Sequence, residues 1–367
     1  MIMKALPPFI AILYYLFAYS FPVDAAQQGV EESPHNTGVT VLIYHRFGED
    51  KYPSTNVSVQ RFREQMAYLK ENNYRVMPLS SLVDALQKNK KIPARAVVIT
   101  IDDGYRSVYE HAWPVLQEFD YPFTVFLYVK ATENNHWNYM TWDQVREMKA
   151  AGADFQNHSF AHHRLVNRPD GMDDKGYLSW IRADLAVSTR IMSEELQERP
   201  RFYAVPYGEY NQAVIDTTRS FGYEAILMQD PGSISQDTNI FSIPREPILG
   251  KEWSTLEHFQ MVLNRVDLPY DTEFPRAGVL SDTIPSRFSA RLLHPERYIQ
   301  SSLGIYVSEL GWQKAVLQND TVSIANSLPL KRRINRVAVS AKEKDSGRTA
   351  IRFWLLVQEE PGIILKP

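Results

Sequence analysis

Three short motifs combine carboxylates, imidazoles and glycine turns, and each follows an apolar segment. They are Asp102-Asp103-Gly104, His158-Ser159-Phe160-Ala161-His162 and Pro206-Tyr207-Gly208. Neighbouring residues at a strand end point in opposite directions, so one aspartate can bind a metal while the other takes a proton from water. Two imidazoles four residues apart can reach one ion, and imidazole with carboxylate suits Zn²⁺ and similar divalent ions.

Each motif alone has a simpler interpretation. Asp-Asp-Gly is a common turn sequence, and two of nine histidines at this spacing are only suggestive. The three motifs together, in chain order and each at the end of a predicted strand, favour a shared site.

The residue types also exclude several mechanisms. The sequence has no cysteine, so any metal must be held by His, Asp, Glu and water. It contains no G-x-S-x-G elbow, H-E-x-x-H helix or P-loop. If the chain cleaves an acyl bond, a metal-activated water is the available nucleophile.

The motifs lie in a region where apolar runs alternate with amphipathic segments. Strands are expected at 39–44, 96–101, 123–129, 152–156, 202–205 and 224–228, and helices from Ser58 and at 105–119, 142–151, 177–196 and 211–221. This alternation predicts an α/β fold with a parallel sheet covered by helices, either open or closed into a barrel. The carboxyl ends of parallel strands face one side, so the three motifs should converge on one cleft.

The sequence pattern changes near residue 265. Prolines punctuate 266–285, which we expect to be a linker, and short strands follow in 286–367, which predicts a small β-sandwich-like accessory domain. We expect this last region to fold independently and to contribute no catalytic group. Trp312 and Trp354 are either a sugar-stacking platform or core residues; we favour core or interface packing for both, with Trp312 the better exposed candidate.

Residues 1–26 have the pattern of a secretory leader. A positive start at Lys4 precedes an apolar stretch and small residues at a cleavage site. An uncleaved anchor is the alternative, but the stretch is short for a span. We therefore expect an exported protein, periplasmic or secreted, with no stable membrane span after cleavage. The formal charge of −3 argues against nucleic acid as a partner.

The three motifs resemble those of the polysaccharide deacetylases, the NodB-homology group of carbohydrate esterase family four. The resemblance covers about residues 39–265 and is strongest to the branch that deacetylates poly-β-1,6-N-acetylglucosamine. It is supported by Tyr44-His45-Arg46, 69–74, 99–105 and 206–211.

The resemblance implies a distorted (β/α) barrel with a defined set of site residues. Asp102 matches the general base of the family, and Asp103, His158 and His162 match its metal triad. The backbone N–H of Tyr207 matches the oxyanion donor.

The sequence departs from the family pattern at two points. Ala204 replaces the arginine that normally orients the base, and Arg245 is the candidate substitute. The usual Leu-x-His that supplies a general acid is spelled at 256–258 and 292–294, and we interpret both as chance matches. His45 either takes that role or satisfies a buried hydrogen bond.

The resemblance implies a metal-dependent hydrolase that removes N-acetyl groups from an N-acetylglucosamine-containing polysaccharide of the exopolysaccharide or biofilm type and releases acetate. One divalent ion is expected, zinc first, with cobalt, nickel or iron as alternatives. The alternative functions are an esterase for O-acetyl groups on a polysaccharide and a non-catalytic glycan-binding protein. The sequence leaves the oligomeric state open.

Overall fold

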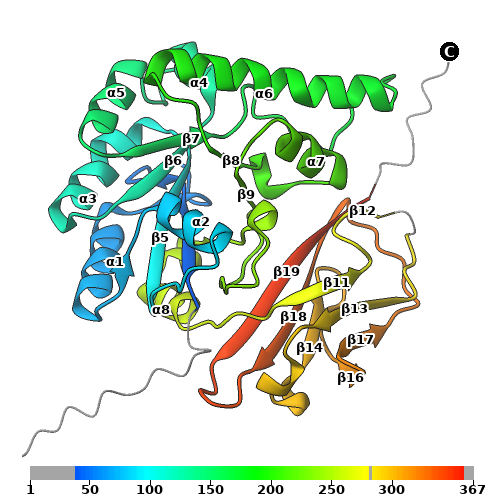
Figure 1. The fold of residues 1–367 in the computed structure, drawn as a ribbon. Helices are drawn as coiled ribbons and strands as arrows, with labels where there is room; N and C mark the ends of the chain where they lie inside the picture. Colours follow the sequence, from blue (N-terminus) through cyan, green and yellow to red (C-terminus); the bar gives the residue numbers. More distant parts are fainter. Residues whose placement is uncertain (1–37, 281–282, 359–367) are drawn as a thin grey trace, which may run out of the picture. The chain divides into compact units, whose positions relative to one another are not determined.

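The protein is described here by a computed structural model that covers residues 38–280 and 283–358 (Figure 1). The expected leader, residues 1–26, lies outside these described residues. Within them, no helix combines the length and the apolar character that a membrane crossing requires.

The N-terminal region is built on one parallel sheet. Its strands are β1 (Thr40–Tyr44), β4 (Arg75–Val76), β5 (Ala96–Asp103), β6 (Phe123–Leu127), β7 (Asp154–Asn157), β8 (Phe202–Ala204), β9 (Ala225–Leu227) and β10 (Glu246–Pro247). They are arranged in the order β10-β1-β5-β6-β7-β8-β9, and β4 also pairs with β5. Ile243 forms a parallel bridge with Leu227, and Glu246 pairs with Leu42. The segment 243–247 therefore contacts both β9 and β1. This contact gives the sheet the form of a curled half-barrel and confirms the expected fold.

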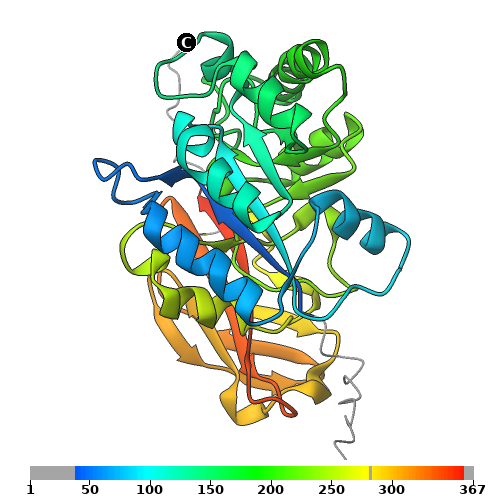
Figure 2. The ribbon, with the colours of Figure 1, turned by 90° about the vertical axis from the view of Figure 1, so that its left-hand side faces the viewer.

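Helices follow most of the strands. They are α1 (Val59–Glu71), α2 (Leu79–Gln87), α3 (Trp113–Phe119), α4 (Val129–Glu133), α5 (Trp142–Ala150), α6 (Asp174–Leu196), α7 (Gln212–Ser220) and α8 (Leu256–Leu263). As predicted, α1 starts after Ser58, whose side chain accepts a hydrogen bond from the N–H of Arg61. Figures 1 and 2 show α1 and α3 side by side on the outside of the strands.

Strand β5 shows how the sheet separates core from site. Val97, Ile99 and Ile101 pack into one cluster with α1 and α8, whereas Ala96 and Val98 pack into a second cluster with α2. Because side chains alternate along a strand, Thr100 and Asp102 continue the second face. On this face of the sheet, the apolar residues Ala96 and Val98 are thus followed by the polar residues Thr100 and Asp102.

The C-terminal region consists of two mainly antiparallel sheets, as expected. Their strands are β11 (Tyr270–Phe274), β12 (Gly278–Leu280), β13 (Arg287–Leu292), β14 (Gly304–Val307), β15 (Gly311–Lys314), β16 (Val316–Gln318), β17 (Thr321–Ala325), β18 (Ile334–Lys342) and β19 (Thr349–Gln358). One sheet has the order β11-β13-β17-β16, and the other has the order β12-β19-β18-β14-β15. Their facing side chains, such as Phe288 and Val339, share one core cluster. Trp354 is in that core, whereas Trp312 lies on an edge strand, is 53% exposed and is not a core residue.

The two regions share more structure than the sequence indicated. Residues 266–285, expected as a linker, include β11 and β12. Leu355 and Val357 of β19 pack into a cluster with Ile226 and Met228 of the N-terminal region. The C-terminal region therefore shares a core with the N-terminal region through β19, which argues against the expectation that it folds independently.

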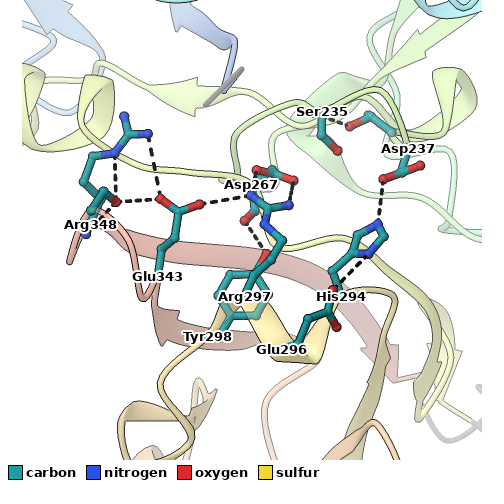
Figure 3. Close-up of polar contacts among 11 residues, drawn as sticks. Ser235, Asp237, Asp267, His294, Glu296, Arg297, Tyr298, Glu343 and Arg348 are labelled. Atoms are coloured by element: carbon teal, nitrogen blue, oxygen red, sulfur yellow. Dashed lines mark hydrogen bonds and ion pairs between the residues drawn. The ribbon is translucent and has the colours of Figure 1, made fainter. Parts of the chain in front are cut away.

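A buried ion-pair network joins the start of the C-terminal region to its later segments (Figure 3). Arg297 donates two hydrogen bonds of 2.9 Å to the carboxylate of Asp267, and a third of 3.1 Å to Glu343. Asp267 and Glu343 are 3% and 6% exposed, so this network is shielded from solvent.

Candidate metal-dependent active site

Asp102 is held by an arginine from a distant part of the chain. Nη1 and Nη2 of Arg245 donate to Oδ1 and Oδ2 of Asp102 at 2.6 and 2.7 Å. Arg245 also donates from Nε to the carbonyl oxygen of Met228 and from Nη1 to Thr100 Oγ1. Both charged side chains are fully buried. The two-pronged contact fixes the carboxylate plane, so the structure brings together the pair that the sequence analysis proposed.

Asp103, His158 and His162 form a compact cluster at the same sheet edge. Asp103 Oδ1 lies 3.4 Å from His158 Nε2 and 3.1 Å from His162 Nε2, and one ligand atom of each residue lies within 4.8 Å of the others. Among the described residues, neither His158 Nε2 nor Asp103 Oδ1 has a hydrogen-bond partner, although both are buried. Buried polar atoms without partners are costly, and one shared cation satisfies both of them. The donor set therefore fits a divalent metal ion.

The orientation of the His158 ring is fixed by a hydrogen bond of the nitrogen that does not face the cluster. Its Nδ1 lies 2.8 Å from the carbonyl oxygen of Ala204. A carbonyl can only accept, so Nδ1 carries the proton and Nε2 presents its lone pair to the cluster. Ala204, where the sequence departs from the family pattern, thus contributes through its backbone.

The loop that carries both histidines has an unusual backbone. Ser159 and His162 adopt left-handed conformations with φ of 78° and 53°, and Asp103 has φ of 72°. Such conformations are costly for residues other than glycine and persist where the surroundings fix them. Asp184 of α6 supplies that support, because its carboxylate accepts hydrogen bonds from the N–H groups of Phe160 and Ala161 at 3.0 and 2.9 Å.

The electrostatics of the site favour ionised carboxylates. Burial alone raises the pKa of Asp102, but the positive charge of Arg245 offsets it, and the pKa lies below its usual value. Burial likewise raises the pKa of Asp103, whereas the neighbouring imidazoles of His158 and His162 bring it well below the usual range. Burial lowers the pKa of His158, but the two neighbouring carboxylates raise it above the usual value. The ionised carboxylates of Asp102 and Asp103 therefore favour a positive charge in the site.

Tyr207 lies in a tight turn at the end of β8. It has φ of 59°, and its ring packs on that of His162, with centroids 4.6 Å apart, and under the guanidinium of Arg164 at 3.8 Å. A Cβ on Gly208 would come within 2.5 Å of the Gln229 side chain, so the turn requires glycine there. The turn is thus rigid and adjoins the metal cluster.

His45 follows β1 at the same sheet edge. Its Nδ1 is buried and has no hydrogen-bond partner in the described part of the chain. Burial lowers its pKa, which the charges of Asp103 and Asp102 partly counteract. The alternative in which His45 satisfies a buried hydrogen bond through Nδ1 therefore gains no support.

The two Leu-x-His matches lie elsewhere. His258 Nε2 is hydrogen-bonded to the carbonyl oxygen of Pro247, and its ring packs on Trp253. His294 lies at the surface, with ring nitrogens 3.4 Å from a carboxylate oxygen of Asp237 and 3.6 Å from one of Glu296 (Figure 3). Neither histidine contacts the cluster in these interactions.

Sequence reasoning missed two positioning residues of the site. Asp184 lies in the middle of a long amphipathic helix, where a carboxylate normally faces solvent, and Thr100 is one polar residue within an apolar strand run. No local signal distinguishes either residue. Only the fold shows that they contact the histidine loop and Arg245.

Comparison with known proteins agrees with this geometry. Residues 89–226 match the profile of the polysaccharide deacetylase family. The chain is 27% identical over 247 residues to the poly-β-1,6-N-acetyl-D-glucosamine N-deacetylase of Escherichia coli strain K12; the match covers 58% of this chain but only 36% of that enzyme. The structure also resembles the deacetylase PplD of Streptococcus pyogenes, solved with acetate (TM-score 0.55, 21% identity, 62% of this chain and 99% of that one).

A second solved structure, IcaB from Ammonifex degensii, gives a TM-score of 0.52 at 25% identity and covers 61% of this chain and 97% of that one. The curled α/β half-barrel and the Asp-His-His triad together define a fold and site of the carbohydrate esterase four type. Residues 89–226 of the chain belong to the polysaccharide deacetylase family. The chain is distantly related to the poly-β-1,6-N-acetyl-D-glucosamine N-deacetylases.

Proposed function

We propose that the protein removes N-acetyl groups from a polysaccharide that contains N-acetylglucosamine, releasing acetate and glucosamine units. The observation that carries the proposal is the buried pair of Asp102 and Arg245 beside the cluster of Asp103, His158 and His162. A held carboxylate next to a metal triad provides a base and a Lewis-acid site at one point. The relationship to N-deacetylases of this polymer supports the choice of substrate.

Asp103, His158 and His162 would hold the ion, for which we propose zinc because imidazole and carboxylate suit it. When bound, such an ion polarises the acetyl carbonyl and lowers the pKa of water toward neutrality. Asp102 is not a ligand in this scheme. It accepts the proton of the attacking water, and Arg245 keeps its carboxylate ionised and oriented.

The remaining steps use residues around the cluster. The N–H of Tyr207 donates to the oxyanion of the tetrahedral intermediate, a contribution of roughly 3 kcal/mol for a well-placed donor. The amine must be protonated as the carbon–nitrogen bond breaks. We assign this transfer to His45, which is neutral at rest because burial lowers its pKa, and which passes to the amine the proton that Asp102 took from the attacking water.

Two other functions use the same scaffold: hydrolysis of O-acetyl esters, and glycan binding without catalysis. Mass spectrometry of products from defined N-acetylated and O-acetylated oligosaccharides separates them. We expect a loss of acetyl groups from the N-acetylated oligomers with the wild type, none with Asp102→Asn, and normal activity with Asp143→Asn, whose side chain is 91% exposed. Turnover of O-acetyl substrates alone would identify an esterase, and binding without turnover of either would identify a non-catalytic protein.

A further inference from the structure

A cavity of about 480 Å³ adjoins the candidate site on the side of β1 and β10. His45 lines it from the site itself, and Ile43 and Pro247 line it from those two strands. Gln229, which packs beneath the Tyr207 turn, forms another part of the wall. The cavity therefore borders the reaction site at His45, and its size is typical of ligand pockets.

Two exposed tryptophans line this cavity from opposite regions of the chain. Trp253, just before α8, is 48% exposed, and Trp312 of β15 is 53% exposed. Each ring is held by an aromatic neighbour: Trp253 packs on His258 at 5.1 Å, and Trp312 packs on Tyr306 at 5.3 Å between ring centroids. Large aromatic surfaces that are held rigidly yet left to solvent mark a binding site.

The other lining residues indicate what kind of ligand fits. Arg336, Ser308 and Gln229 place hydrogen-bonding groups among the aromatic rings. A pyranose ring has an apolar C–H face that packs on an aromatic ring, and hydroxyl and amide groups that need polar partners. Among the described residues, none that lines the cavity is a carboxylate, and Arg336 repels a cation. The lining therefore suits a neutral N-acetylated sugar and disfavours a protonated glucosamine.

We propose that this cavity is a subsite for an N-acetylated sugar unit next to the unit that is being deacetylated in the same polymer chain. The proposal rests on the proposed function and extends it, because the C-terminal sheets then contribute to substrate recognition through Trp312. The preference for a neutral unit directs the enzyme toward stretches of polymer that still carry acetyl groups.

The test compares long and short substrates on the full-length protein. Trp312→Ala and Trp253→Ala should each lower kcat/KM for a β-1,6-linked N-acetylglucosamine pentamer about tenfold, a change of about 1.4 kcal/mol. Both should leave hydrolysis of 4-nitrophenyl acetate unchanged, because this small ester does not reach the cavity. Trp312→Phe, which keeps an aromatic face, should recover most of the loss.

Matched controls come from exposed apolar residues outside the cavity. Met261→Ala on α8 (48% exposed) and Leu328→Ala in the C-terminal region (57% exposed) should have wild-type values on both substrates. Unchanged pentamer kinetics in both tryptophan variants, or equal losses on pentamer and small ester, would overturn the subsite.

A binding measurement distinguishes failure of the proposed subsite from failure of the proposed function. The tryptophan fluorescence of the wild type should respond to the acetylated pentamer at lower concentration than to the fully deacetylated pentamer, and Trp312→Ala should lose the difference. If the wild type deacetylates nothing, the proposed function fails while this measurement still decides the subsite. An equal response to both pentamers refutes the preference for neutral sugar.

Discussion

Replacing Arg245 with methionine tests the proposed base most directly. Met has a comparable length but no charge, so Arg245→Met leaves the carboxylate of Asp102 buried without its two charged hydrogen bonds. Breaking a buried ion pair in this way costs about 3–5 kcal/mol of unfolding free energy. At about 2–4 °C per kcal/mol, the melting temperature should fall by roughly 6–20 °C.

The same change should move the pH dependence of catalysis. In the wild type the pKa of Asp102 is lowered, so stabilisation by the ionised pair is present above the usual carboxyl pKa of about 3.9 and is lost as the pH falls through the lowered value. Without Arg245, burial dominates and the pKa rises. The acid limb of the pH profile of kcat/KM should therefore shift to higher pH, so the variant loses more activity at pH 5 than at pH 8.

The assay is kcat/KM for 4-nitrophenyl acetate across pH, with thermal unfolding measured in parallel. Arg297→Met is the matched control, because Arg297 forms a similar buried two-pronged pair with Asp267 away from the cluster (Figure 3). It should lower the melting temperature without moving the acid limb. If Arg245→Met is destabilised and its acid limb stays at the wild-type pH, Arg245 is only structural and the reasoning fails.

Three other predictions follow from the site and the fold. His158→Ala should lose both bound metal and activity, whereas Asp102→Asn should keep the metal and lose turnover; equal metal loss by elemental analysis would contradict the separation of ligand and base. N-terminal sequencing of the native protein should find a start near Ala26 or Gln27, and an intact first residue would favour the anchor. A protein truncated at Pro285 should be insoluble or bind a hydrophobic dye, because it lacks β19 and so exposes the N-terminal residues that β19 covers. A soluble truncated protein with wild-type thermal stability would show that β19 is dispensable.

The buried parallel strands were predictable because each is a short, continuous apolar run. Strand β5 was expected to end at residue 101 but extends to Asp103, since two charged residues at its end conceal the strand from any hydrophobic pattern. Strand β11, in the expected linker, was missed for a related reason. It is an edge strand with mostly exposed side chains, so it does not show the alternation that identifies a half-buried strand.

The site was predictable where its chemistry depends on residue type and local spacing. Asp103, His158 and His162 do lie together, and Arg245 does contact Asp102. The sequence could not show that Trp312 lines a cavity beside the site, because that depends on how the last strands pack against the first region. Long-range packing of this kind leaves no local pattern.

The contribution of β19 to the N-terminal core has a consequence for biosynthesis. The hydrophobic cluster that contains Ile226 is complete only when Leu355 and Val357 are available. Domains generally fold as they emerge from the ribosome, at about 5–20 residues per second, so these partners arrive on the order of ten seconds later. During that interval the nascent half-barrel exposes an apolar face. Chaperone binding should therefore concentrate on this surface, and a ribosome stalled shortly before Leu355 should carry a chain that is sensitive to protease near β9.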